Sequence, residues 1–194
     1  MNVQDLFLAD IERQCKFAVI AYNGLVSVFQ SGNLISSDRY KREESLVMFW
    51  FYLQAFLVAA GNISKILWPS ELPKCKKCNF QDQLSSKVIS RGVNLRNLLS
   101  IKESSLLKHR KFRNYFEHYD FYIQEWHEKS RDRVLIDSNI SVIDYPAGRT
   151  PGSVAYMRNF DPDRFVLTFR NKEYKINDVL YEIKQLLEKI ETLS

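Results

Sequence analysis

The stretch LVMFWFYLQAFLVAA, residues 46–60, decides the fold of this chain. Wound as a helix it is apolar on every side, with Gln54 as the one break, so it belongs in a protein core or at an interface between subunits. The run is too short to cross a hydrocarbon layer of about 30 Å. Its continuation carries Asn62, Ser64 and Lys65, which a membrane interior disfavours. The sequence therefore predicts a central buried helix and no membrane span.

Capping residues and helix breakers set the limits of the helices around this run. Asp38 is the predicted N-cap of the central helix, because its short side chain can accept hydrogen bonds from the first free backbone amides, and Pro69 ends that helix. Apolar residues also recur at helical spacing over residues 3–30, and residues 31–33, Ser-Gly-Asn, follow as a break. Two long helices are therefore predicted before Pro69.

The middle of the chain is predicted to be a loop followed by two more helices. Residues 69–83 contain two prolines and are predicted to form the loop. A shorter helix is predicted at residues 85–99. A long one is predicted at residues 103–129, because this range is rich in helix-favouring residues and has no Gly or Pro.

The character of the sequence changes after Arg133. β-Branched and apolar residues at 134–136 suggest a strand. Residues 164–170 and 173–176, joined by a short turn, predict a β-hairpin. Asn177 is the predicted cap of a final amphipathic helix.

These elements predict a mainly α protein. We expect an antiparallel helical bundle over residues 1–132, and a C-terminal β-hairpin appendage with a closing helix over residues 133–194, packed on the same domain. A chain of 194 residues with 45% hydrophobic residues can bury one substantial core.

The net charge of +5 permits a polyanionic partner such as RNA without requiring one. Basic residues are clustered at Lys108, Arg110 and Lys111, which are the candidate RNA-binding residues, and a second cluster lies at residues 74–77. Two solvated surfaces are the alternative interpretation of these clusters.

The cysteines indicate a reducing compartment. Cys15, Cys75 and Cys78 cannot all pair and do not form the framework of a secreted protein, and the N-terminus lacks a secretory pattern, so a cytoplasmic protein is expected. The Cys75-x-x-Cys78 spacing is half of a zinc site without a second cysteine pair. We therefore predict no metal and no cofactor, and leave zinc binding by these two cysteines open.

Residues 113–118, Arg-Asn-Tyr-Phe-Glu-His, contain the candidate catalytic residues Arg113, Asn114 and His118. On a continuous helix with about 100° per residue, Asn114 and His118 fall one turn apart on a common flank, away from the predicted core stripe. An exposed histidine without a role is the alternative for His118, and a salt bridge to Glu117 is the alternative for Arg113. The residues of the predicted stripe are Phe112, Phe116, Tyr119, Ile123 and Trp126.

This motif resembles the signature of the HEPN superfamily, an Arg followed four to six residues later by His on a late helix of a helical bundle, commonly with Asn directly after the Arg. The resemblance implies RNA cleavage at a cleft composed of two motifs across a homodimer. It also implies a toxin or defence role, in some members with an antitoxin partner. HEPN toxins paired with a nucleotidyltransferase antitoxin often carry Tyr two places after the His, where this chain has Asp120.

The three residue types suit RNA cleavage without a metal. The ribose 2′-OH would attack the adjacent phosphorus, and histidine can carry the protons that this step moves. The guanidinium of Arg113 can stabilise charge on the phosphoryl oxygens, and Asn114 can orient the phosphate or the imidazole. The expected function is a metal-independent endoribonuclease. The alternatives are a HEPN-fold module that binds RNA, a nucleotide or a protein without cutting, and a structural bundle whose hairpin docks a partner.

Overall fold

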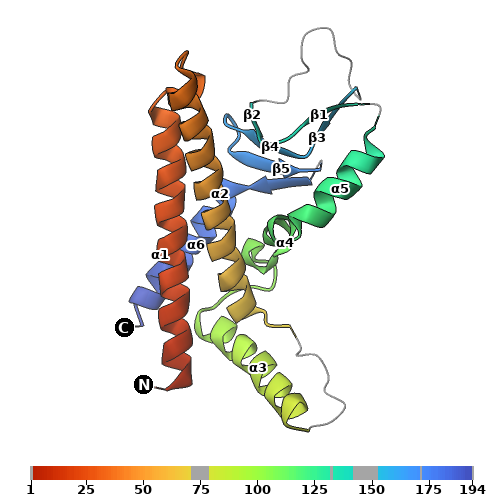
Figure 1. Cartoon of the computed structure of the whole chain (residues 1–194). Coiled ribbons are helices and arrows are strands. Elements are labelled where there is room, and N and C mark those ends of the chain that lie inside the picture. The colour runs from red at the N-terminus through yellow and green to blue at the C-terminus, as the bar shows by residue number, and fades with distance from the viewer. Residues whose placement is uncertain (1, 71–78, 132, 142–152, 171, 194) are drawn as a thin grey trace. The chain divides into compact units, whose positions relative to one another are not determined.

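The structure is a computed structural model, and it describes residues 2–70, 79–131, 133–141, 153–170 and 172–193. The chain is mainly helical with a small sheet near its C-terminal end (Figure 1). It divides into two compact units, one made of residues 1–110 and 180–194 and the other of residues 111–179. The predicted boundary between residues 132 and 133 does not coincide with either limit of the second unit.

The first unit begins with the two predicted long helices. Helix α1 spans Val3–Gln30 and helix α2 spans Arg39–Leu67, which confirms both predictions. Gly32 adopts the left-handed conformation (φ 70°) that favours glycine after a helix end. The Asp38 side chain accepts hydrogen bonds from the backbone N–H groups of Tyr40 and Lys41, as expected for the N-cap.

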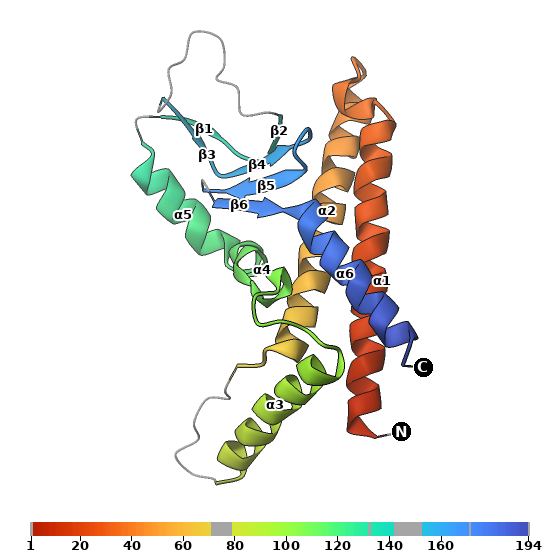
Figure 2. The same cartoon turned by 180° about the vertical axis from the view of Figure 1, so that it is seen from behind.

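Helices α1 and α2 lie side by side and run in opposite directions, as both views show (Figure 2). Phe29 and Phe49 meet edge to face with ring centroids 5.2 Å apart. A Cβ on Gly24 would come within 2.5 Å of the Tyr52 ring, so this glycine permits the close approach of the two helices. The side chains that are fully buried along this pair include Ile11, Cys15, Leu25, Leu53 and Phe56.

Only part of the surface of α2 is buried. Val47 and Phe51 are more than half exposed, although the helix is apolar all round. Because the helix continues to Leu67, α2 is long and apolar enough to cross a membrane by length and composition alone, and 44% of its most apolar window is buried inside the structure. The core helix of a soluble protein meets the same test, so this finding is compatible with the predicted soluble protein.

Helix α3 spans Asn79–Leu98, so the loop predicted at residues 69–83 is wrong for residues 79–83, and residues 71–78 lie outside the described parts. The two prolines of that segment precede Asn79, and no further Pro or Gly occurs in residues 79–83. At the other end of α3, the Arg96 side chain donates to the carbonyl oxygen of Leu67. A Cβ on Gly92 would come within 2.4 Å of Pro69.

The single long helix predicted at residues 103–129 is wrong. The structure has a 3₁₀ turn at Leu106–Lys108 (η2), then α4 at Lys111–Glu117 and α5 at Tyr119–Lys129. Another 3₁₀ turn (η1) at Asn33–Ile35 joins α1 to α2. Contacts with a residue distant in the sequence explain why residues 103–108 are not α-helical. Glu182 accepts hydrogen bonds from the Ser105 hydroxyl and the Leu106 N–H. These contacts replace the helical bonds that the local sequence favours.

The second unit contains two small sheets. Strand β1 (Val134–Ile136) pairs in parallel with β3 (Val154–Tyr156). The four-stranded sheet has the order β2-β4-β5-β6, with β2 parallel to β4 and the remaining neighbours antiparallel. Its strands are β2 (Asn139–Ile140), β4 (Arg158–Asp161), β5 (Val166–Phe169) and β6 (Lys172–Lys175).

The predicted hairpin is confirmed as β5 and β6, but it is part of this larger sheet, because β4, for which no strand was predicted, pairs with β5. Helices α4 and α5 lie on one side of the sheet (Figure 1). The closing helix α6 spans Ile176–Glu191 and begins one residue before the predicted cap Asn177. The second limit between the units falls within α6, after Val179.

Candidate functional site

The candidate motif lies at the break between α4 and α5. Asn114 is in α4, and His118 is the N-cap residue of α5 with φ −110° and ψ 34°. The His118 N–H donates to the Asn114 carbonyl oxygen at 3.0 Å, and the His118 carbonyl oxygen accepts from the Tyr122 N–H at 3.2 Å. The backbone of His118 is thus fixed on both sides while its imidazole is exposed.

The predicted exposure of Asn114 and His118 is confirmed, but the burial predicted for the core stripe is confirmed only in part. Trp126 is buried, whereas Phe116, Tyr119 and Ile123 are half-buried. The Phe112 side chain lies outside the described parts. Because the helix breaks at His118, one helical wheel does not apply to α4 and α5 together.

Arg113 is largely buried, in contrast to the exposed Asn114 and His118. Its side chain is only 11% exposed and forms an ion pair with Glu117, the alternative considered for it. Its Nε and Nη1 atoms are buried without a hydrogen-bond partner. Leaving buried donors unpaired is unfavourable, more so on a charged group. Arg113 therefore has donors to offer to an anion that reaches them.

The structure does not bring the three motif side chains into mutual contact. Within the described parts of the chain, no hydrogen bond joins the side chains of Arg113, Asn114 and His118 to one another. One chain thus presents one exposed imidazole at the motif and an arginine that is held inward by Glu117.

A charged network next to His118 anchors the start of α5. The Tyr119 hydroxyl donates to Asp137 Oδ2 at 2.8 Å, and Arg158 Nε donates to Asp137 Oδ1 at 2.9 Å. The Arg158 guanidinium also lies over the Tyr119 ring, 4.4 Å from its centroid, and donates to the Ser138 hydroxyl at 2.8 Å. This network ties the residue that follows His118 to the residues after β1 and to β4.

Burial and charge shift the pKa values of this network in the directions expected for a stable ion pair. Burial works to raise the pKa of Asp137, but the hydrogen bonds and charge of Arg158 outweigh it, and the pKa is lowered. Burial works to lower the pKa of Arg158, and Asp137 outweighs it, so that pKa is raised. Burial, followed by the hydrogen bond to Asp137, raises the pKa of Tyr119.

Sequence reasoning missed Asp137 and Arg158, which are distant in the chain from Tyr119. The only local sign was an acidic residue directly after the strand-like residues 134–136. Their pairing depends on the parallel register of β1 with β3, and no periodicity in the sequence reports such a pairing.

Aromatic contacts hold α4 against the sheet. The Tyr115 ring stacks on Phe169 of β5 with centroids 4.6 Å apart and planes 13° apart.

An ion pair holds α5, in which Glu125 Oε2 pairs with Arg170 Nη1 at 2.5 Å. Hydrogen bonds from Arg170 and then Lys129 lower the pKa of Glu125 to about 2.

The predicted RNA-binding residues do not share one environment. Lys108 is exposed and pairs with Glu103 (Nζ to Oε2, 2.9 Å), while Arg110 is half-buried and its Nη2 donates to the Ser70 hydroxyl at 3.3 Å. Both belong to the first unit. Lys111 is exposed and begins the second unit.

Comparisons of the chain with protein-family models, with curated proteins and with solved structures find no match. Within the described residues, no group of three or more His, Cys, Asp or Glu side chains is placed to hold a metal ion. Cys75 and Cys78 lie outside those residues.

Proposed function

We propose that this chain is a metal-independent endoribonuclease of the HEPN type, with Arg113, Asn114 and His118 as its catalytic residues. The observation that carries the proposal is the contrast within the motif, an exposed imidazole at His118 close in sequence to an arginine with buried, unsatisfied donors. The helical character of the chain supports it, and an HEPN-like antiparallel bundle is part of the proposal.

The reaction needs only side chains. A base removes the proton of the ribose 2′-OH, the 2′ oxygen forms a bond to phosphorus, and the bond from phosphorus to the 5′ oxygen breaks as an acid protonates that oxygen. The products are a 2′,3′-cyclic phosphate and a 5′-OH. The guanidinium of Arg113 would exchange Glu117 for the phosphoryl oxygens, where charge builds up.

A single His118 per chain cannot be acid and base in one step. We propose a homodimer in which two motifs form one cleft, so that one His118 is the base and the partner's His118 is the acid. The exposed apolar residues Val47 and Phe51 of α2 are one surface available for a two-fold contact. A cytoplasmic toxin or defence role with an antitoxin protein completes the proposal, and Lys108, Arg110 and Lys111 are its RNA-binding residues.

Incubation of RNA with the purified protein in EDTA tests the proposal. Cleavage that leaves 2′,3′-cyclic phosphate ends is expected, and strict dependence on Mg²⁺ would contradict it. His118→Ala should abolish cleavage. His127→Ala is the matched control, because His127 is also an exposed histidine, in the last turn of α5, and its replacement should leave cleavage unchanged.

A second candidate function is a HEPN-fold module that binds RNA, a nucleotide or a protein without cutting. The ion pair between Arg113 and Glu117 favours it, because it occupies part of the guanidinium that catalysis would need. Saturable RNA binding without cleavage in EDTA or Mg²⁺ would place this function first.

A further inference from the structure

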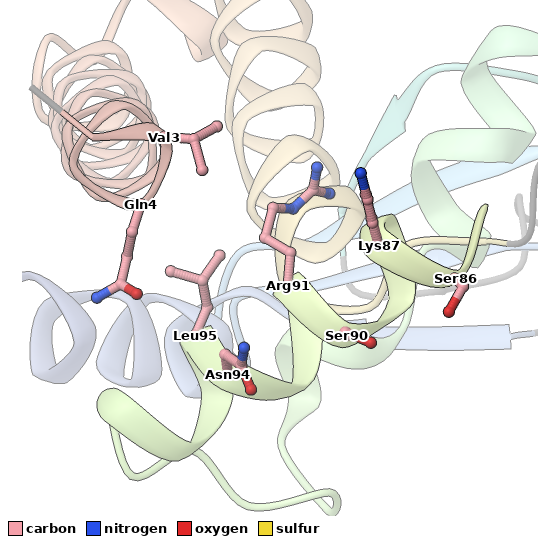
Figure 3. A pocket seen from close by; sticks show the side chains of 8 residues that line it. All are labelled: Val3, Gln4, Ser86, Lys87, Ser90, Arg91, Asn94 and Leu95. Carbon is pink, nitrogen blue, oxygen red and sulfur yellow. The ribbon is translucent and has the colours of Figure 1, made fainter. Parts of the chain in front are cut away.

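A cavity of about 270 Å³ lies in the first unit between the first turn of α1 and one face of α3. Its lining residues belong to the first unit, whereas the residues of the candidate motif belong to the second. Figure 3 shows Val3 of α1 pointing towards α3, and Lys87 and Arg91 rising from α3 in the same direction. The lining residues are Val3, Gln4, Ser86, Lys87, Ser90, Arg91, Asn94 and Leu95.

Arg91 is a half-buried cation that has no anionic partner among the described residues. Its guanidinium lies 3.9 Å from the centre of the Phe7 ring, and its Nε is buried without a hydrogen-bond partner. None of the ion pairs within the described parts of the chain includes Arg91. Burial lowers the pKa of Arg91, because the charged guanidinium loses contact with water. Arginines in such positions are usually paired, so Arg91 has capacity for an anion.

The other walls of the cavity add donors and one more cation. Lys87 lies one helical turn before Arg91, and Ser90 and Asn94 offer polar side chains on the same face of α3. Val3 and Gln4 are the first residues of α1, where backbone N–H groups have no acceptor within the helix and the helix dipole is positive.

The carboxylate nearest to this end of α1 in the sequence is already engaged. Asp5 Oδ2 accepts a hydrogen bond from the Asn2 N–H at 2.9 Å, as one half of a capping box. In the described parts of the chain no ion pair joins Asp5 to Arg91, and the residues that line the cavity include two cations and no acid.

We infer that this cavity binds the phosphate group of a nucleotide, with Arg91 and Lys87 as its cationic ligands. Arginine suits this role because its planar fork can donate two hydrogen bonds to one phosphate. The cavity is larger than a phosphate, and the apolar side chains of Val3 and Leu95 provide a wall for the sugar or base. The source is a free nucleotide or the terminal phosphate of an RNA. This inference goes beyond the proposed ribonuclease and does not rest on it.

Calorimetric titration with adenosine 5′-monophosphate tests the inference. Saturable binding is expected, and Arg91→Gln should weaken it by about tenfold or more, which is the loss expected for a hydrogen bond to a charged group. Arg13→Gln is the matched control, since it removes one positive charge from an exposed position of α1 away from the cavity and should leave the affinity unchanged.

Lys87→Gln keeps the test valid if Arg91→Gln fails to fold, because Lys87 is exposed and its replacement should not affect folding. It should weaken binding several-fold. No binding of the nucleotide or of inorganic phosphate at millimolar concentration would overturn the inference, and so would an equal loss of affinity in Arg13→Gln.

Competition identifies the source of the phosphate. A 2′-O-methyl RNA with a 5′-phosphate resists cleavage by 2′-OH attack, so its binding does not depend on the proposed activity. If it displaces the nucleotide while the same RNA with a 5′-hydroxyl does not, the site binds an RNA terminus. If neither RNA displaces the nucleotide, the site binds a free nucleotide.

Discussion

His118 and Arg113 are five residues apart and have opposite surroundings. The imidazole is exposed at a helix break, while the guanidinium is mostly buried and keeps two nitrogen atoms without partners. Residues placed in this way should respond differently to substitution, because one contributes little to folding and the other carries unpaired donors.

Substitution at His118 and at Phe116 should separate chemistry from folding. His118→Ala should change the free energy of unfolding by less than about 0.5 kcal/mol, because the side chain of His118 is exposed. Phe116→Ala should lower the free energy of unfolding by about 1 to 3 kcal/mol, because it removes a half-buried ring. The centroid of this ring lies 6.3 Å from that of Phe169, and the Arg158 guanidinium lies over it. Chemical denaturation of both variants measures the two values. An equal loss in both would make His118 a structural residue.

The thiol of Cys15 should be inert in the folded protein. Burial, followed by the charge of Glu12, raises its pKa to about 12, so almost no thiolate forms near neutral pH. A variant with Cys75→Ser and Cys78→Ser isolates this thiol. It should react with a disulfide reagent only after unfolding, and rapid reaction under native conditions would contradict the burial of Cys15.

At the scale of elements, the break between α4 and α5 is the feature that positions the motif. Tyr115 stacks on Phe169 before the break, and Tyr119 bonds to Asp137 after it. Both helices are thus held to the sheet region, where they share Phe169 as a partner through Tyr115 of α4 and Tyr122 of α5. These contacts are tertiary, and they override a local sequence that favours one continuous helix.

The sequence predicted elements whose limits are local and missed those set by distant contacts. Asp38 and Gly32 gave the ends of α1 and α2, because capping and a left-handed turn depend on neighbouring residues. The break at His118 depends on partners far along the chain. For the candidate site, the exposure of Asn114 and His118 was predicted correctly, but from a continuous helix that the structure does not have. The burial of Arg113 and the Asp137–Arg158 pair were not predicted.

Asp137→Asn should loosen the start of α5. Arg158 would then keep a mostly buried charge without its carboxylate, and we expect a loss of about 1 to 3 kcal/mol in stability. Asp120→Asn is the control, because it removes an exposed acid from the same helix and should have little effect. Thermal and denaturant unfolding compare the two. Equal stability of both variants would show that the pair does not hold α5.

Acid should weaken the attachment of α5 to the sheet. Asp137 and Glu125 have lowered pKa values in the folded protein, so the stability that they contribute is fully present above their unfolded pKa values and is lost as pH falls through the folded ones. For Glu125 this window runs from 4.5 to about 2. The free energy of unfolding, measured by denaturation at several pH values, should fall across it, and Glu125→Gln should make the fall shallower.

At the scale of the whole molecule, each chain carries one copy of the motif, and the proposed cleft needs two. Light scattering should therefore report an even-numbered assembly, at twice the chain mass of 22.9 kDa or a higher even multiple. Val47→Glu together with Phe51→Glu should shift the assembly towards monomers if α2 forms the contact. A wild-type monomer at micromolar concentration would remove the composite cleft.

The first unit is assembled from both ends of the chain, since residues 180–194 join residues 1–110. Helix α6 contributes the buried side chains of Ile183, Leu186 and Ile190, and Glu182 accepts a hydrogen bond from the Ser105 hydroxyl. During translation, residues 180–194 are synthesised after all residues of the second unit. The nascent chain can therefore form its second unit while the first still lacks a helix, although N-terminal domains ordinarily fold first during synthesis. A stop codon before Leu180 would remove buried residues from the first unit and would leave every residue of the second unit in the chain.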